Sequence, residues 1–306
     1  MVGRLSLGSR EASTFIMSDN PKNAPKGVTL LKGPTIVRHR DAARFLWGDS
    51  TSGEVADVIY GRNEVIGTLI FRLRPGGYFK SSDTWKSYFD QDRFYYVLKG
   101  EIAVQDPQSG EIAVARAGEA VHWRGAKWHF GYNFTADETI VLDWYAPQER
   151  PPNVSELEFG ATKPKFEGEK AGRFELLGKW PHALSEARAE AERRGGLITA
   201  SRQDALHFIH GDRHPIMEAL FVSTKELTAG TVDLMPSARS DDRTHPSDKV
   251  IFVTAGKLHV YLPQTYDWFE LDEWDLLYLP ADTPHQYWNY SGRPLSFAFM
   301  VVPRYA

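Results

Sequence analysis

His129-Phe-Gly-Tyr-Asn133 and His285-Gln-Tyr-Trp-Asn289 are two short stretches that share one His-to-Asn spacing. Each His lies 29 residues after a glycine, since 129 − 100 = 29 for Gly100 and 285 − 256 = 29 for Gly256. The second stretch is therefore displaced from the first by 285 − 129 = 156 residues, without a gap. A displacement of this kind indicates an internal repeat, in which two copies of one unit fold alike.

The same displacement superposes further residues along the chain. These pairs are Asp92 and Asp248, Val97 and Val253, Val104 and Val260, Pro107 and Pro263, Gln108 and Gln264, and Pro147 and Pro303. A length of 306 residues independently suggests about two domains. We therefore interpret the chain as a duplicated domain.

Short apolar runs separated by turn-forming residues predict the class of fold. Phe94-Tyr-Tyr-Val-Leu98, Thr139-Ile-Val-Leu-Asp-Trp144 and Asp275-Leu-Leu-Tyr-Leu279 are typical runs, and Gly or Pro residues bound most of them. Short strands at regular spacing with such punctuation are typical of all-β sandwiches and barrels. Residues 148–180 are rich in Pro, Gly, Lys and Glu and read as a linker, and residues 181–194 then predict one helix.

These patterns divide the chain into four predicted segments. They are a flexible N-terminal arm over 1–28, an N-terminal barrel over 29–150, a linker with one helix over 151–200, and a C-terminal barrel over 201–306.

Composition excludes several classes of function. The net charge is −4 and there is no basic run, so we do not expect a nucleic-acid partner. The absence of Cys excludes disulfides and thiolate chemistry, and it fits a reducing compartment, so we expect a cytoplasmic protein. No apolar run approaches the ~18 residues that a membrane span requires. Exposed sheet edges in such a fold favour self-association, and we expect a homo-oligomer, most simply a dimer.

The residues around both His resemble the cupin superfamily, in particular its two-barrel members, the bicupins. The family's second motif contains Pro-x-Gly, two residues, His, three residues and Asn. The second half has Pro280-Ala-Asp-Thr-Pro-His285-Gln-Tyr-Trp-Asn289, and the first half has Arg124-Gly-Ala-Lys-Trp-His129-Phe-Gly-Tyr-Asn133. The resemblance covers most of residues 60–147 and 215–303. It implies two tandem jelly-roll barrels, the double-stranded β-helix fold, joined by a short helical linker.

The family's first motif, His-x-His followed by Glu and Gly, is altered in both halves. Counting back from Gly256 gives Arg243-Thr-His245 for His-x-His and Lys249 for Glu, and counting back from Gly100 gives Arg93 for Glu. In the family these positions hold a metal ion. Guanidinium and ammonium groups carry positive charge and offer no lone pair, so they cannot replace metal ligands.

Metal binding is therefore not expected in the first barrel. In the second barrel, His245 and His285 with an oxygen from Asp241 or Asp242 would be the ligands of a weakly bound Fe, Mn, Ni or Zn ion. The positive charge of Lys249 opposes such a site unless burial removes its proton.

A substrate-binding set follows from the family's strand parity, in which alternate residues point into the barrel. The set is Arg93, Tyr95, His129, Asn133 and, in the second barrel, Asn289. A buried guanidinium needs an anionic partner, which a carboxylate-bearing small molecule would supply. Alternatively, Arg93 pairs with an internal acid, Asp90 or Asp143, and is purely structural.

A catalytic set is predicted in the second barrel by the same parity. It consists of Arg243, His245, Lys249 and His285. Burial should lower the pKa of the lysine or of the histidines, which is how general acids and bases are made. Alternatively, these side chains lie on the exposed rim of a barrel that has lost its function.

Three functions remain open on the sequence. The first is a bicupin small-molecule enzyme, an isomerase or lyase that acts by acid–base chemistry on an anionic or carbonyl-bearing, possibly aromatic, substrate. The second is a metal-dependent cupin dioxygenase that uses His245 and His285. The third is a non-catalytic bicupin that binds a ligand or has a structural role.

Overall fold

The computed structural model of the chain describes residues 25–89, 91–125, 127–146, 196–303 and 305. Within them the regular structure is β-strand apart from one short 3-10 helix, η2 (His39–Asp41). The predicted helix over 181–194 and most of the predicted N-terminal arm lie outside the described residues. Among the described residues, no helix is long and apolar enough to cross a membrane.

The first barrel is built from two facing sheets and a small two-stranded sheet. Its larger sheet contains, in order, β1 (Thr29–Leu30), β4 (Gly53–Arg62), β5 (Gly67–Leu73), β14 (Thr139–Ala146), β8 (Asp92–Lys99), β11 (Ala120–Trp123) and β15 (Ile198–Ala200), with β3 (Ala43–Asp49) beside β4. Its smaller sheet contains β10 (Ile112–Arg116), β9 (Glu101–Gln105), β13 (Phe130–Tyr132) and β6 (Tyr78–Phe79). The two-stranded sheet pairs β12 (Lys127–Trp128) with β7 (Tyr88–Phe89).

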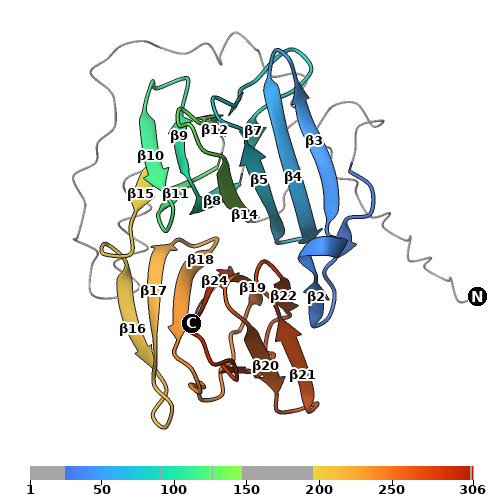
Figure 1. Cartoon of the computed structure of the whole chain (residues 1–306), viewed down its shortest axis with the longest axis vertical. Helices are drawn as coiled ribbons and strands as arrows, with labels where there is room; N and C mark the ends of the chain where they lie inside the picture. Colours follow the sequence, from blue (N-terminus) through green and yellow to red (C-terminus); the bar gives the residue numbers. More distant parts are fainter. Residues whose placement is uncertain (1–24, 90, 126, 147–195, 304, 306) are drawn as a thin grey trace, which may run out of the picture.

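The second barrel repeats this plan below the first in Figure 1. Its larger sheet contains, in order, β16 (Leu206–His210), β17 (Ile216–Ser223), β18 (Thr228–Leu234), β24 (Leu295–Val302), β19 (Asp248–Ala255), β22 (Leu276–Leu279) and β2 (Thr35–Val37). Its smaller sheet contains β21 (Asp267–Leu271), β20 (Leu258–Leu262) and β23 (Gln286–Trp288). The predicted all-β fold of two barrels is confirmed.

The two glycines that define the repeat occupy equivalent tight turns. Gly100 and Gly256 have φ angles of 76° and 83°, in the left-handed region that side chains disfavour. A Cβ atom would lie 2.8 Å from the carbonyl oxygen of Glu138 at the first and 2.8 Å from that of Pro294 at the second. Because 294 − 138 is also 156, the repeat extends to the residues that enclose each turn.

Three apolar clusters hold the molecule together. One fills the first barrel around Val97, and one fills the second around Val253, its equivalent in the repeat. The third lies between the barrels, where Phe94 and Trp144 of the first meet Phe221 of the second. Each larger sheet is thus apolar on both faces, since one face lines its own barrel and the other packs against the neighbouring barrel.

Short strands are exchanged between the two barrels (Figure 1). Strand β2 lies in the segment predicted to form the first barrel, yet it pairs with β22 of the second. Strand β15 lies in the predicted linker and pairs with β11 of the first barrel. The exchange is reciprocal, because β11 and β22 are equivalent strands of the repeat, so each barrel completes the larger sheet of the other.

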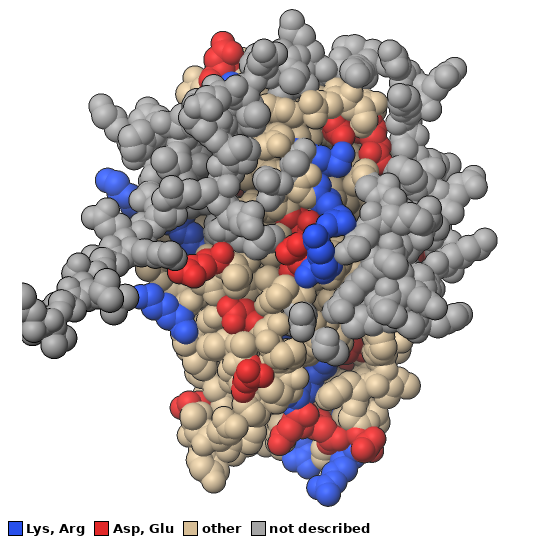
Figure 2. Space-filling model, turned by 180° about the vertical axis from the view of Figure 1, so that it is seen from behind, with Lys and Arg blue, Asp and Glu red and all other residues tan. Residues whose placement is uncertain are grey.

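Charged side chains of both signs are interspersed on the face of the molecule in Figure 2. Basic and acidic groups alternate along this face, in keeping with the net charge of −4. The expectation that nucleic acid is not a partner stays a prediction.

Candidate functional site

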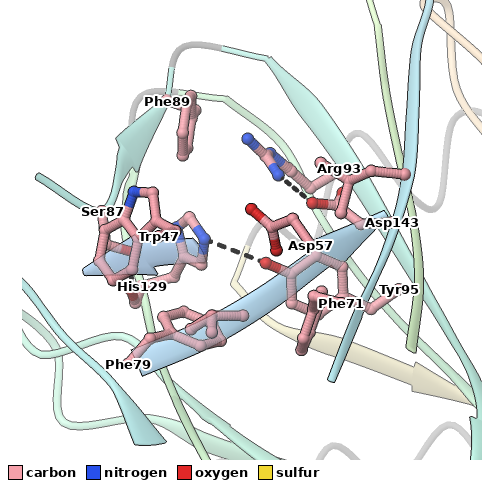
Figure 3. Close-up of a pocket in the computed structure, with 12 residues that line it drawn as sticks. Trp47, Asp57, Phe71, Phe79, Ser87, Phe89, Arg93, Tyr95, His129 and Asp143 are labelled. Atoms are coloured by element: carbon pink, nitrogen blue, oxygen red, sulfur yellow. Dashed lines mark hydrogen bonds and ion pairs between the residues drawn. The ribbon is translucent and has the colours of Figure 1, made fainter. Parts of the chain in front are cut away.

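A small pocket lies inside the first barrel, with a volume of about 50 Å³. This is room for several waters or one small molecule. Polar groups from separate strands meet at the pocket, and apolar and aromatic side chains form the remaining wall (Figure 3). The lining residues are Trp47, Val55, Asp57, Leu69, Phe71, Phe79, Ser87, Phe89, Arg93, Tyr95, His129 and Asp143.

Arg93 forms a buried ion pair with Asp143, one of the two partners considered on the sequence. Its guanidinium lies 3.8 Å from the ring centroid of Phe89 and 4.5 Å from that of Tyr145. Arg93 Nε and Asp143 Oδ1 are buried and have no hydrogen-bond partner among the described residues. Because buried polar atoms are normally paired, these two atoms are available to a bound molecule or to water.

Asp57 is a second carboxyl group in the same pocket and is almost completely buried. Burial raises the pKa of Asp57 well above its ordinary value, and the charge of Asp143 raises it further, while Arg93 acts in the opposite direction. Burial also raises the pKa of Asp143, to about 6, against the opposing effect of Arg93. One cation therefore faces two carboxyl groups, and the site is neutral when Asp57 keeps its proton.

His129 and Tyr95 form a polar pair across the pocket from Arg93 (Figure 3). The Tyr95 hydroxyl lies 3.3 Å from His129 Nε2. Burial, followed by the charge of Arg93, lowers the pKa of His129 well below its ordinary value. The imidazole is therefore neutral at physiological pH, and such a group can accept a proton.

The structure thus brings together Arg93, Tyr95 and His129 from the predicted substrate-binding set, but not Asn133. The Asn133 amide donates to the backbone carbonyls of Leu73, Arg74 and Asp137 and joins the ends of two chain segments.

Asn289 behaves in the same way in the second barrel, where its amide donates to the backbone carbonyls of Leu234 and Arg293. The repeated His-x-x-x-Asn spacing therefore combines an inward-facing His with an Asn that fixes the backbone.

In the second barrel, Arg243 is held in a buried ion pair with Glu218, which is fully buried. The Tyr305 hydroxyl also donates to Glu218, and Arg243 Nη2 donates to the Tyr305 hydroxyl oxygen over 3.1 Å. The charge of Arg243 is therefore matched within the protein. These groups are buried inside the barrel and do not lie on an exposed rim.

The other three predicted catalytic residues belong to one hydrogen-bond chain. Lys249 Nζ lies 3.0 Å from His245 Nε2 and also donates to the Tyr287 hydroxyl. That hydroxyl lies 3.2 Å from His285 Nε2. The chain ends on two backbone oxygens: Nδ1 of His245 lies 2.8 Å from the carbonyl of Tyr305, and Nδ1 of His285 lies 2.9 Å from that of Thr283.

This arrangement fixes the tautomers of both histidines. A backbone carbonyl only accepts, so each Nδ1 carries the proton and each Nε2 accepts one, from Lys249 at His245 and from Tyr287 at His285. Burial is the main reason that the pKa values of Lys249, His245 and His285 are all lowered. The lowered pKa of the lysine agrees with the sequence-based expectation.

The donor set in the second barrel does not fit the metal ion that the fold family implies. The described residues contain no cluster of three or more His, Cys, Asp or Glu that could hold one. Lys249 donates to His245 Nε2, the lone pair that a metal would need, and Glu218 is paired with Arg243.

The two acids considered as oxygen ligands are engaged elsewhere. Asp241 accepts from the backbone N–H groups of Asp212 and Arg213, and Asp242 accepts from the Gln286 amide. Neither is available to complete a site with the two histidines.

Sequence reasoning missed Asp57 and Glu218, which occupy equivalent places. Asp57 lies opposite Phe71 and Glu218 lies opposite Val232, and both offsets are 161 residues, since 218 − 57 = 232 − 71. A displacement of 156 residues does not align them. The available signal was a lone acid inside each apolar run, Val55-Ala-Asp-Val-Ile59 and Ile216-Met-Glu-Ala-Leu220.

Comparison with known proteins places this geometry in a family. Residues 230–302 match the cupin domain family. Among curated proteins, none matches the chain in sequence.

Several solved structures share the fold over most of the chain. Oxalate decarboxylase from Lactobacillus farciminis, in complex with formate, is 15% identical, with a TM-score of 0.59 over 94% of this chain and 90% of that one. YlbA from Escherichia coli is 10% identical, with a TM-score of 0.58 over 92% and 95%. AerE from Microcystis aeruginosa is 10% identical, with a TM-score of 0.54 over 90% and 99%. The chain is therefore a two-barrel protein of the cupin superfamily, a bicupin.

Proposed function

We propose that the first barrel is an active site for acid–base chemistry on a small carboxylate- or carbonyl-bearing compound, in an isomerase or lyase reaction. One observation carries the proposal: a carboxyl group that favours its protonated form and an imidazole that favours its neutral form line one pocket. These groups are Asp57 and His129. Two titratable groups whose environments push their pKa values in opposite directions are the usual sign of an acid and a base.

Each polar group of the pocket has a role in this reaction. Arg93 binds the substrate carboxylate or carbonyl oxygen through the N–H groups that Asp143 does not use. His129 takes a proton from the carbon next to the carbonyl, directly or through the Tyr95 hydroxyl. The C–H bond breaks, an N–H bond forms, and the Asp57 proton moves to the carbonyl oxygen to give a neutral enol. Return of the proton to another carbon completes an isomerisation.

The size and lining of the pocket support a small substrate. A volume of about 50 Å³ admits a compound of a few non-hydrogen atoms, and the aromatic wall strengthens charge interactions by excluding water. One relative with this fold is named an oxalate decarboxylase and was solved with formate, so small carboxylates are a reasonable first panel.

The predicted catalytic set of the second barrel has no reacting role in this proposal. Arg243 is matched by Glu218, and His245, His285 and Lys249 satisfy one another and the backbone. A metal-dependent dioxygenase reaction is not proposed, because Lys249 and the second-barrel acids leave too few free donors around the two histidines.

Hydrogen–deuterium exchange at the carbon next to a carbonyl would test the proposal. The full-length protein is incubated in D₂O with glyoxylate, pyruvate and larger 2-oxo acids, and exchange at carbon is followed by NMR. We expect Asp57→Asn and His129→Gln to slow the exchange of an active compound by about 10²-fold or more. His245→Gln, a matched change in the second barrel, should leave the rate within a few-fold. Equal exchange in Asp57→Asn and the unaltered protein would refute the assignment.

A further inference from the structure

The two barrels are joined by a reciprocal pair of hydrogen bonds to buried aspartates. Thr224 of the second barrel donates to Asp92 Oδ2 of the first over 2.8 Å. Asn63 of the first barrel donates to Asp248 Oδ2 of the second over 2.9 Å. The aspartates are equivalent, since 248 − 92 = 156, and the donors share the offset of the Asp57 region, since 224 − 63 = 161.

Both donors occupy the same place in the fold. Asn63 follows β4 and accepts from the backbone N–H of Ile66 over 2.8 Å, and Thr224 follows β17 and accepts from that of Leu227 over 3.1 Å. Each side chain thus closes its own turn and also reaches the opposite barrel. The pair forms an internal matched comparison.

Asp92 receives more than this one contact. His122 Nε2 lies 3.6 Å from Asp92 Oδ2, and Arg124 Nε lies 3.8 Å from Asp92 Oδ1. Burial acts to raise the pKa of Asp92, but the contacts with His122, Thr224 and Arg124 hold it below its ordinary value. A buried carboxylate of this kind depends on its hydrogen bonds, so loss of the Thr224 donor changes the position of the carboxylate.

Asp92 is the first residue of β8, and the next residue is Arg93. Successive side chains of a strand point to opposite faces, so Asp92 faces the second barrel while Arg93 faces the pocket. Tyr95, two residues further along, lines the same pocket. We propose that Thr224 is a positioning residue for the pocket: by holding Asp92, it fixes the end of the strand that carries Arg93 and Tyr95. The inference rests on the proposed function, which makes that pocket the active site.

The equivalent contact in the second barrel lacks this consequence. Asp248 precedes Lys249, whose amine is held by His245 and Tyr287 inside the second barrel. Asp248 also accepts from the Tyr278 hydroxyl over 2.8 Å and from the Ala281 N–H over 3.0 Å. Loss of the Asn63 donor therefore affects a strand end that is remote in sequence and fold from the first-barrel pocket.

The experiment compares Thr224→Ala, Thr224→Ser and Asn63→Ala in the full-length protein. Unfolding temperature, the Arg93 Nε–H resonance in NMR spectra and the dissociation constant for glyoxylate are measured for each variant. We expect both alanine variants to lower the unfolding temperature by similar amounts. Only Thr224→Ala should shift or broaden the Arg93 resonance and raise the dissociation constant, by about three- to tenfold. Thr224→Ser should restore both.

Two results would overturn the inference. One is an Arg93 resonance in Thr224→Ala that matches the unaltered protein. The other is an Arg93 resonance that moves equally in Asn63→Ala. The NMR signal reports on the positioning even if glyoxylate does not bind. A protein that neither binds nor exchanges any compound of the panel would count against the proposed function, while the resonances would still decide the role of Thr224.

Discussion

The two barrels start from the same frame and reach neutrality in opposite ways. His129 corresponds to His285, and Arg93 corresponds to Lys249. In the first barrel one cation faces two carboxyl groups, Asp57 and Asp143. In the second barrel, position 299, the equivalent of 143, is a phenylalanine, and two basic side chains share the single carboxyl of Glu218.

Burial accounts for the outcome in each barrel. A charge without a partner is costly inside a protein, so the surplus group gives up its charge. In the first barrel the surplus group is an acid, and Asp57 retains its proton. In the second it is a base, and Lys249 favours the neutral amine. The difference teaches that one substitution, Asp143 against Phe299, decides which kind of titratable group each barrel holds in reserve.

The largest expected effect comes from breaking the ion pair of the second barrel. Glu218→Ala leaves Arg243 buried without its counter-charge, which should lower the free energy of unfolding by about 3–5 kcal/mol. Chemical denaturation measures the loss, with Glu54→Ala, at an exposed position, as the control. The double change Glu218→Leu with Arg243→Met should recover much of the stability. A loss below about 1 kcal/mol for Glu218→Ala would show that the pair is not desolvated as described.

A smaller effect should separate the two barrels in ligand binding. Arg93→Met removes the cation of the first pocket and should weaken binding of glyoxylate by about 10- to 100-fold, which corresponds to the loss of one charge-assisted hydrogen bond or two. Lys249→Met, the equivalent change in the second barrel, should leave the affinity within about twofold, because that amine contacts only internal partners. Isothermal titration measures both. Loss of affinity in Lys249→Met alone would move the binding site to the second barrel.

The smallest effect is a pH dependence of stability. The pKa of Asp57 is raised in the folded state, so the folded protein holds this proton at pH values where the unfolded chain has released it. Stability from this group is present below the ordinary carboxyl pKa and is lost as pH rises through the raised value, at up to about 1.4 kcal/mol per pH unit.

Asp57→Asn removes this dependence, so its stability relative to the unaltered protein should increase with pH over that window. The pKa of Asp143, raised to about 6, adds a loss of the same sign that persists in the variant. Denaturant melts between pH 4 and 9 provide the measurement. A stability difference that stays constant with pH would mean that Asp57 ionises normally in the folded protein.

Much of the fold followed from local patterns. The repeated glycines at 100 and 256 predicted twin turns, and both adopt the left-handed conformation that requires glycine. Apolar runs predicted strands because alternation along a strand is a local property of the chain. The exchange of β2 and β15 between barrels had no such signal, since a three-residue strand pairs wherever a free sheet edge is available. Self-association and a cytoplasmic location stay predictions.

The candidate site was predicted only in part. Strand parity placed Arg93 and Tyr95 on one face, and both line the pocket. It also placed Asn133 inward, whereas the amide of that residue binds three backbone carbonyls at a turn. Asp57 lies outside the repeat of 156 residues, so no comparison between the halves brought it to the pocket.

The sequence by itself determined the doubling, the strands and the basic side chains that replace metal ligands, because spacing and residue type are properties of the chain. Only the tertiary structure decided which carboxyl meets which cation. Asp57, Arg93 and Asp143 come from three strands, and their charges depend on how deeply the barrel buries them and how close it brings them. Proton affinity inside a protein is set by the three-dimensional surroundings of a group, which no local pattern of residues specifies.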